Sequence, residues 1–494
     1  MDIFIIILFA VIAFFTRIIN LLNIPIFTDE AIYIRWAQIG LFDPAQRYIS
    51  LTDGKQPLLT WLMYPMLKIF SDPLYAGRFV SVLSGVAAVI GIYFLTRELF
   101  GRKAAIFSML LYIFSPFAIV YDRLALMDSL LAMFGIWASF LQILLVKKQE
   151  LDKALLLAIV IGLGLLTKSS ALFYLYLLPV SLLFFNFKAK DKVKKFIKWI
   201  LLSLSIFIIA EVMYNSLRLS PWFYIIKLKN YSFILTISEF THNPWKLFIP
   251  NLNGLTQILI GYITIPIFIT VIIGLVFGII KKDKKIFYLF SWFIFPFISL
   301  GLFGKVIFPR FILFMIMPLY IISAYVLSGM FSFAQNKMKI MYLLVLLIFI
   351  YPVYQSCVVM FSPKDVQIPR NDRNQLFDDW PSGYGVKEVI SYLDQKSKTG
   401  QIVVGTEGTF GLFPAGIEIY LGMNSNIKIL GFWPVSQVPD VLLEAAIKYP
   451  TYLIFKESQN IPKEWPLTLV EEYRRGKGNT YLKFYRVDPA KFRT

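Results

Sequence analysis

Two adjacent carboxylates, Asp29 and Glu30, follow the first long apolar run of the chain in the segment FTDEAIYIRWA. Ionisable groups next to a membrane are costly unless they are solvated, paired or used in chemistry. One such carboxylate could act as a general base that takes the proton from an attacking hydroxyl group. The simpler interpretation is a helix N-terminus, with Thr28 or Asp29 as the cap. Both can hold, because a capped helix end positions a carboxylate well.

A second polar cluster lies in TDGKQPLLTW, where Asp53 and Lys55 flank a glycine. Lys55 could hold a phosphate as a mobile point charge, and Asp53 could orient that lysine or bind a metal ion. The alternative is a turn that precedes an apolar helix.

Ionisable residues also border the later apolar runs. Asp128 lies about one turn inside an apolar helix, where an ionisable group is a functional candidate. Arg123 precedes it and could be an ordinary interfacial residue. Lys168 and Arg310 stand at the ends of two other runs, where they could reach the membrane surface or bind an anionic head group. Together with Lys55, they indicate a phosphate-bearing ligand.

Metal and nucleotide chemistry find little support. His242 is the only histidine, so a three-histidine zinc site is impossible, and a surface position is its simplest interpretation. The single cysteine, Cys357, excludes disulfides and cysteine-based zinc sites within one chain. There is no Walker A or dinucleotide motif. We expect no essential metal, although a divalent ion remains possible, and no nucleotide cofactor.

Long apolar segments must position these residues. The chain of 494 residues is 58% hydrophobic and 16% charged, with a mean hydropathy of +0.67, whereas soluble domains are ~45–50% apolar and ~25% charged. This composition indicates a polytopic membrane protein and excludes a cytosolic enzyme, a disordered chain and a disulfide-rich secreted module. About eleven membrane helices are expected, near 3–22, 74–96, 104–121, 124–146, 154–167, 170–187, 199–216, 255–280, 286–303, 311–330 and 340–360.

Lysine and arginine are concentrated in alternate connections of this bundle, which predicts that those connections are cytoplasmic. They are 97–103, 147–153, 188–198, 281–285 and 334–339. The net charge of +19 is therefore a topology signal and does not indicate nucleic-acid binding. The N-terminus is expected in the cytoplasm, and the long loops 23–73 and 217–254 are expected on the extracytoplasmic side of the membrane. Their aromatic and apolar stretches predict interfacial helices, and long structured loops on one side often form a site.

Residues 361–494 differ from residues 1–360, because charge rises and apolar runs shorten. We expect this region to be a small α/β domain on the extracytoplasmic side, after the linker FSPKDVQIPRNDRN. The predicted helices are GVKEVISYLDQ and VPDVLLEAAIKY, and the predicted strands are QIVVGTE, NIKILGFW, PTYLIFKE and TYLKFYRV.

In their order and spacing, these motifs resemble those of the GT-C glycosyltransferases of the protein O-mannosyltransferase and lipid A aminoarabinose transferase type. The resemblance covers most of the chain. It is carried by the acidic pair, GKQPLLTW, AGRFVSVLSG with Arg78, RLALMDSLLA, LTKSSAL, PRFILFMIMP and FPAGIEIYLG.

The resemblance implies a helical GT-C membrane bundle that transfers a sugar from a polyprenyl-phosphate donor, with inversion, on the extracytoplasmic face. The acceptor is a lipid, a glycan or a protein. Asp29 would be the general base, and Glu30 would support it or the acceptor. Asp128 would help organise the acceptor or the sugar, and the lipid phosphate would be bound by Lys55, Lys168 and Arg310. Where related aminoarabinose transferases have Glu-Lys-Pro-Pro, this chain has Asp53-Gly54-Lys55-Gln56-Pro57, which places a metal contact there in doubt. The alternative function is a transporter of polyprenyl-linked sugars without transferase activity.

Overall fold

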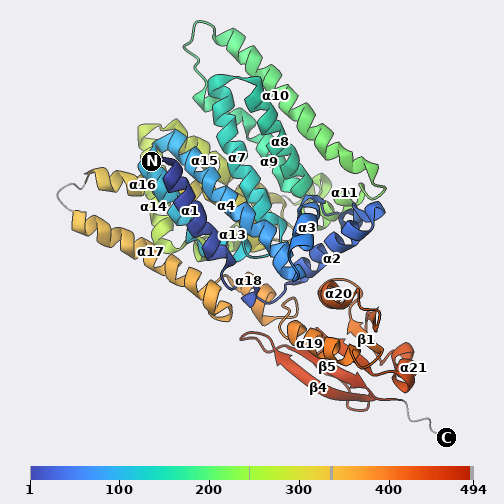
Figure 1. Cartoon of the computed structure of the whole chain (residues 1–494). Coiled ribbons are helices and arrows are strands. Elements are labelled where there is room, and N and C mark those ends of the chain that lie inside the picture. The colour runs from blue at the N-terminus through green and yellow to red at the C-terminus, as the bar shows by residue number, and fades with distance from the viewer. Residues whose placement is uncertain (1, 244, 334–337, 490–494) are drawn as a thin grey trace.

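The computed structural model describes residues 2–243, 245–333 and 338–489. A bundle of helices carries a small sheet domain at one end (Figure 1). The helices of the bundle are α1 (Asp2–Ile18), α2 (Thr28–Phe42), α3 (Leu58–Ile69), α4 (Pro73–Phe100), α5 (Arg102–Ile113), α6 (Pro116–Tyr121), α7 (Met127–Lys148), α8 (Leu151–Thr167), α9 (Leu172–Tyr176), α10 (Lys192–Asn215), α11 (Ile225–Phe233), α12 (Ile237–His242), α13 (Phe248–Ile263), α14 (Ile265–Lys281), α15 (Lys284–Phe303), α16 (Leu313–Phe333) and α17 (Met338–Phe361).

The membrane character of the bundle is confirmed, but most of the short expected spans are not single long helices. Among the described residues, seven helices are long and apolar enough to cross a membrane, or up to eight if the bent pair α13–α14 forms one span. The expected span 104–121 divides into α5 and α6, because Ser115 caps a new helix that starts at Pro116. The span 170–187 is a short α9 followed by a 3₁₀ helix containing Pro179. Residues 334–337 of the expected connection 334–339 lie outside the described residues.

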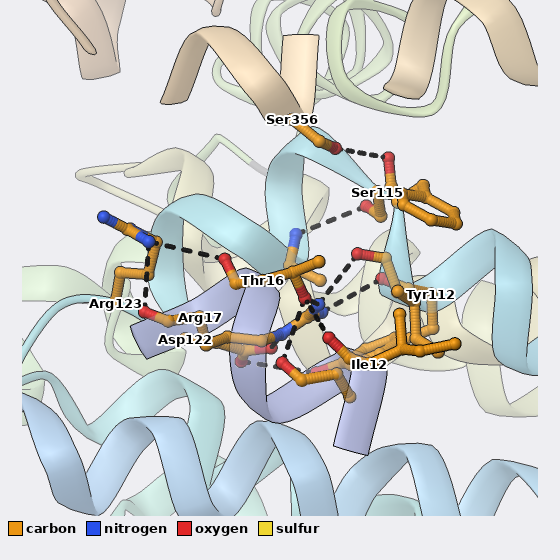
Figure 2. Close-up of polar contacts among 12 residues, drawn as sticks. Ile12, Thr16, Arg17, Tyr112, Ser115, Asp122, Arg123 and Ser356 are labelled. Atoms are coloured by element: carbon orange, nitrogen blue, oxygen red, sulfur yellow. Dashed lines mark hydrogen bonds and ion pairs between the residues drawn. The ribbon is translucent and has the colours of Figure 1, made fainter. Parts of the chain in front are cut away.

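Buried arginines fix the end of α1 against the segment that follows α6 (Figure 2). The Nε of Arg17 donates to Asp122 Oδ2 at 3.2 Å, and both side chains are fully buried. Arg123 Nη1 donates to the carbonyl oxygens of Arg17 and Ile19, at 3.1 and 2.7 Å. The last carbonyl groups of a helix have no partners within it, so Arg123 satisfies them from a neighbouring segment. The contacts of Arg123, one of the candidate site residues, are therefore structural.

The C-terminal region contains the small sheet, in the order β2-β1-β3-β5-β4. Strand β1 is parallel to β2 and β3, whereas β5 runs antiparallel to β3 and β4. The four predicted strands and two predicted helices are confirmed, and β4, α20 and the short α18, which lies in the expected linker, are additional. The elements are α18 (Arg370–Arg373), α19 (Val386–Ser397), β1 (Ile402–Glu407), α20 (Ala415–Leu421), β2 (Ile427–Phe432), α21 (Asp440–Lys448), β3 (Thr451–Phe455), β4 (Leu467–Arg474) and β5 (Tyr481–Val487).

Helix α2 joins this domain to the bundle. It forms in the segment expected to be an interfacial helix, but α20 covers one of its faces (Figure 1). Arg35 Nε donates to Glu418 at 3.0 Å, and Gln38 Nε2 donates to the carbonyl of Ile419 at 2.7 Å. Apolar residues of the bundle and of the sheet domain belong to one buried cluster. The sheet domain is therefore packed onto the helix that begins with the acidic pair.

Candidate active site

The turn that carries Lys55 is built around Gly54, whose φ of +66° lies in the left-handed region. Its N–H donates to the carbonyl of Leu51, which closes the preceding 3₁₀ turn. A Cβ at Gly54 would lie 2.5 Å from Cβ of Lys229 and 2.8 Å from the carbonyl oxygen of Ile225. Only glycine therefore allows α11 to approach this turn, and Lys229 Nζ donates from α11 to Asp53 at 2.5 Å.

The two long loops that the sequence predicted to lie on one side of the membrane, 23–73 and 217–254, thus meet at one place. They enclose a cavity of about 470 Å³ together with the ends of several membrane helices. Much of its wall is apolar, with side chains from Phe173, Phe233, Leu235, Ile237, Leu300 and Phe303 among others. Four basic side chains and one carboxylate line the same cavity: Lys55, Lys168, Lys229, Arg310 and Asp128.

Three of the four cations are paired with carboxylates. Lys168 Nζ donates to Asp128 Oδ1 at 2.7 Å, and Asp128 is only 4% exposed. Arg310 Nη2 donates to Asp29 Oδ2 at 3.0 Å, and its Nε lies 3.9 Å from Asp128 Oδ2. The structure therefore brings Asp29, Asp128, Lys168 and Arg310 into one charged cluster. Asp29 is next to the cavity wall through Arg310 and is itself partly exposed.

Lys55 is the exception. Within the described part of the chain, no carboxylate lies within 4.0 Å of its ammonium group, and its recorded contact is with the ring of Phe233, at 5.2 Å. Burial lowers the pKa of Lys55 to about 8, and the nearby charges of Lys168 and Arg310 act in the same direction. The cavity therefore presents one positive charge that lacks a counter-charge.

The lowered pKa of Lys55 predicts that phosphate binding depends on pH. A phosphate contact with Lys55 requires the ammonium form, which is lost as the pH rises through about 8. We expect the affinity for a polyprenyl phosphate, the ligand that the sequence resemblance implies, to fall by about tenfold between pH 7.5 and 9.5, since one charge-assisted hydrogen bond contributes ~1.5–3 kcal/mol. Binding in nanodiscs measures this. The matched variant is Lys55→Arg, whose guanidinium stays charged and whose affinity should not change over this range. Parallel pH profiles for the two proteins would contradict the assignment.

Glu30 has different surroundings from its neighbour. It is fully buried, and its two oxygens accept from Arg78 Nε and Nη2, both at 2.8 Å. They also accept from the backbone N–H groups of Phe27 and Ala125, at 2.9 and 2.7 Å. Neither Thr28 nor Asp29 caps α2, because Thr28 Oγ1 donates instead to the carbonyl of Pro381. Glu30 and Arg78 thus connect the start of α2 to α4, and neither lines the cavity.

The linker after α17 supplies residues that could not be selected from the sequence. Gln375 Oε1 accepts from Arg310 Nη1 at 3.3 Å. The buried Asp372 accepts hydrogen bonds from the hydroxyl groups of Tyr121 and Tyr262, and burial raises its pKa to about 6. The backbone pairs here too, since Thr28 N donates to the carbonyl of Pro381 at 3.1 Å. Asp29 and Arg310 are therefore held partly by residues of the C-terminal region.

Two candidates stand apart from the cluster. His242 is exposed, its Nδ1 lies 2.7 Å from the carbonyl of Ser238, and it does not line the cavity. Asp53 forms an ion pair with Lys229. No group of three or more His, Cys, Asp or Glu side chains that could hold a metal ion occurs among the described residues. The expectation that no metal is essential stays a prediction.

Comparisons with known proteins agree with this picture. The family model for dolichyl-phosphate-mannose-protein mannosyltransferase matches residues 54–214, whereas no curated protein sequence matches the chain. ArnT from Cupriavidus metallidurans in the apo state is similar over 98% of this chain and 97% of its own, with 13% identity and a TM-score of 0.60. The same enzyme bound to undecaprenyl phosphate gives 12% identity and a TM-score of 0.57 over the same shares.

A more distant likeness is to the archaeal oligosaccharyltransferase AglB from Archaeoglobus fulgidus, in complex with an inhibitory peptide and a dolichol-phosphate. It covers 92% of this chain and 69% of AglB, with 13% identity and a TM-score of 0.54. The two types of protein have one fold in common, and the resemblance found in the sequence is confirmed. The chain has the fold of the GT-C superfamily of membrane glycosyltransferases.

Proposed function

We propose that the chain is an inverting glycosyltransferase that moves a sugar from a polyprenyl-phosphate donor to an acceptor hydroxyl. The observation that carries the proposal is the unpaired Lys55 in a largely apolar cavity, next to the cluster of Asp29, Asp128, Lys168 and Arg310. An apolar wall suits a polyprenyl chain, and a basic end suits its phosphate. The lipid phosphates named with ArnT and AglB support this choice of donor.

In the proposed reaction, Asp29 takes the proton of the acceptor hydroxyl. The acceptor oxygen forms a bond to the anomeric carbon as the bond from that carbon to the phosphate oxygen breaks. The electron pair of the broken bond stays on the polyprenyl phosphate, which is the leaving group. Lys55, Lys168 and Arg310 stabilise its increasing negative charge, because they are positioned before the reaction begins. Asp128 holds Lys168 and lies near Arg310.

The proposal includes the location of the reaction. The chain would be a multi-pass protein of the plasma membrane, with a cytoplasmic N-terminus and the cavity and sheet domain outside. The support is the distribution of lysine and arginine among the connections between helices.

A donor panel tests the proposed function. The protein is placed in nanodiscs with radiolabelled polyprenyl-phosphate mannose, aminoarabinose, glucose or galactose, and a membrane extract serves as acceptor. We expect one donor to give labelled product, and Lys55→Met to lower the rate by at least tenfold. The matched control is Lys227→Met, an exposed lysine on α11 that does not line the cavity. If vesicles containing the protein move labelled lipid across the bilayer and no donor gives product, the transporter alternative replaces this proposal.

A further inference from the structure

The carboxyl ends of β1 and β3 lie side by side in the sheet of the C-terminal domain. In open α/β sheets, ligands bind beyond the carboxyl ends of the strands, at the point where the strand order reverses. The order β2-β1-β3 places that point between β1 and β3. The loops that follow these strands are therefore the place in the domain where a ligand site is most favoured by the topology.

Glu407 ends β1 and organises the loop after β3. It is 2% exposed and accepts from the backbone N–H groups of Lys456 and Glu457, at 2.7 and 2.6 Å. The N–H of Ser458 and its hydroxyl group donate to the same carboxylate. These hydrogen bonds fix the loop. The four donors to the Glu407 carboxylate are three backbone N–H groups and one hydroxyl group, and the Lys456 ammonium group is not among them.

Lys456 follows β3 and lacks a counter-charge. Its side chain is 94% buried, since its exposed fraction is 6%, and its Nζ lies 4.8 Å from the ring centre of Trp380 and 5.5 Å from that of Trp433. Across the described ranges, no carboxylate lies within 4.0 Å of this ammonium, and no hydrogen-bond acceptor is recorded for it. Burial lowers the pKa of Lys456, whereas the charges of Glu457 and Glu407 act in the opposite direction.

A second cation adds to the positive potential here. Arg475 is fully buried, and its Nη2 donates to the carbonyl oxygen of Lys456 at 2.7 Å. Its Nη1 has no hydrogen-bond partner among the described residues. Lys456 and Arg475 are thus two cations near the loop after β3, where the Glu407 carboxylate is held by backbone and hydroxyl donors.

Aromatic rings extend from this charge to the protein surface. Trp433 is 56% exposed and Phe410 is 51% exposed, although both are large apolar side chains. Phe410 packs against Trp36 of α2, with 6.1 Å between the ring centres. Flat aromatic faces beside a polar group suit a ligand that is apolar on one side and polar on the other. The C–H face of a sugar ring is such a surface, and an acidic substituent on that sugar would pair with Lys456.

This surface is close to the candidate base. A Cβ at Gly411 would lie 3.4 Å from Thr28 Cγ2, so the loop after β1 touches the residue that precedes Asp29. Trp36 lies seven residues after Asp29 on α2, which is about 10 Å along the helix at 1.5 Å per residue. One or two sugar units can span that distance.

We propose that Lys456, Trp380, Trp433 and Phe410 form a subsite for a negatively charged sugar unit of the acceptor. The acceptor role rests on the proposed function, whereas the binding of an anionic sugar does not. The subsite would hold the acceptor glycan while its reacting hydroxyl group reaches Asp29.

Binding of defined probes to the full chain tests this subsite. Wild-type protein in nanodiscs of neutral lipid is titrated with glucose 6-phosphate, methyl glucoside and inorganic phosphate, and binding is followed by ligand-observed NMR. We expect glucose 6-phosphate to bind best, and both Lys456→Met and Trp433→Ala to raise its Kd at least tenfold. The matched controls are Lys448→Met, an exposed lysine of the same domain, and Trp245→Ala, an indole 66% exposed on an outer loop. Binding of undecaprenyl phosphate confirms that each variant is folded.

Three outcomes would overturn the subsite: no binding of glucose 6-phosphate to wild type, equal binding by the variants, or equally tight binding of inorganic phosphate with no effect of Trp433→Ala. Displacement of the sugar by an acidic peptide of equal affinity would also count against a glycan. Because the readout is binding, it separates the two proposals. If the wild-type protein binds glucose 6-phosphate but transfers no sugar from any donor, only the proposed function is contradicted. If it transfers sugar but does not bind glucose 6-phosphate, only the subsite is contradicted.

Discussion

Asp29→Asn is expected to lower the turnover number by about 10²- to 10⁴-fold, the usual contribution of a general base. The asparagine has nearly the same shape, and its amide oxygen can still accept from Arg310, which donates to Asp29 at 3.0 Å in the wild type. The affinity for undecaprenyl phosphate should therefore change little, since Asp29 does not line the cavity. Transfer from the donor identified in the panel, measured with saturating acceptor, gives the turnover number.

The comparison with Asp128→Asn makes this test specific. Asp128 is paired with Lys168 and is almost completely buried, so its substitution should weaken binding of the lipid phosphate more than Asp29→Asn does. If Asp29→Asn retains the wild-type turnover number, Asp29 is not the base. A large loss of turnover in Asp128→Asn, with unchanged lipid affinity, would then transfer the role to Asp128.

Glu30→Gln is expected to lower the free energy of unfolding by about 3–5 kcal/mol, the usual cost of breaking a buried ion pair from one side. The substitution leaves the Arg78 guanidinium buried without its carboxylate. It also places an NH₂ group among donors, because both oxygens of Glu30 accept hydrogen bonds from Arg78 and from backbone N–H groups. Unfolding in mixed detergent micelles, followed by circular dichroism, measures the change.

The control for this prediction is a less buried ion pair. Glu98 accepts from Lys147 at 2.6 Å, and both side chains are about one-third exposed. Glu98→Gln should therefore cost less than about 1 kcal/mol. The double variant Glu30→Gln with Arg78→Met should be less destabilised than the sum of the two single variants. If Glu30→Gln is as stable as Glu98→Gln, the structural role assigned to Glu30 is wrong.

Composition was sufficient to predict where the long helices lie, but not where they break. The span expected near 255–280 is divided at Thr264, whose φ is +73°, and the helices on its two sides are bent by 109°. Both sides of the break are apolar, so the hydropathy pattern does not mark it. Strand β4 was not predicted because its sequence, LTLVEEYR, is charged and lacks an apolar alternation. The strand is mostly exposed, since it forms the edge of the sheet.

The candidate site shows a similar division. Asp29, Asp128, Lys168 and Arg310 could be selected from the sequence, because ionisable residues are unusual beside apolar helices. Lys229, Asp372 and Gln375 could not, since only the folded chain brings Lys229 to the cavity and the other two to its surroundings. Nor could the sequence separate Asp29 from Glu30. Successive helix residues point about 100° apart, and packing decides which one meets Arg78 and which one meets Arg310.

The pairing of residues 27–28 with residues 381–383 bears on how the folded chain is made. The ribosome produces the candidate base before Arg310, Gln375 and Pro381, which hold Asp29 and its neighbour Thr28 in place. During synthesis, the first helices of the bundle can insert into the membrane well before the residues that contact Asp29 and Thr28 have been made. A chain that is released early would be membrane-bound and able to meet polyprenyl phosphates, but it would lack the complete charged cluster. The surroundings of Asp29 are therefore complete only in chains that extend through residues 381–383.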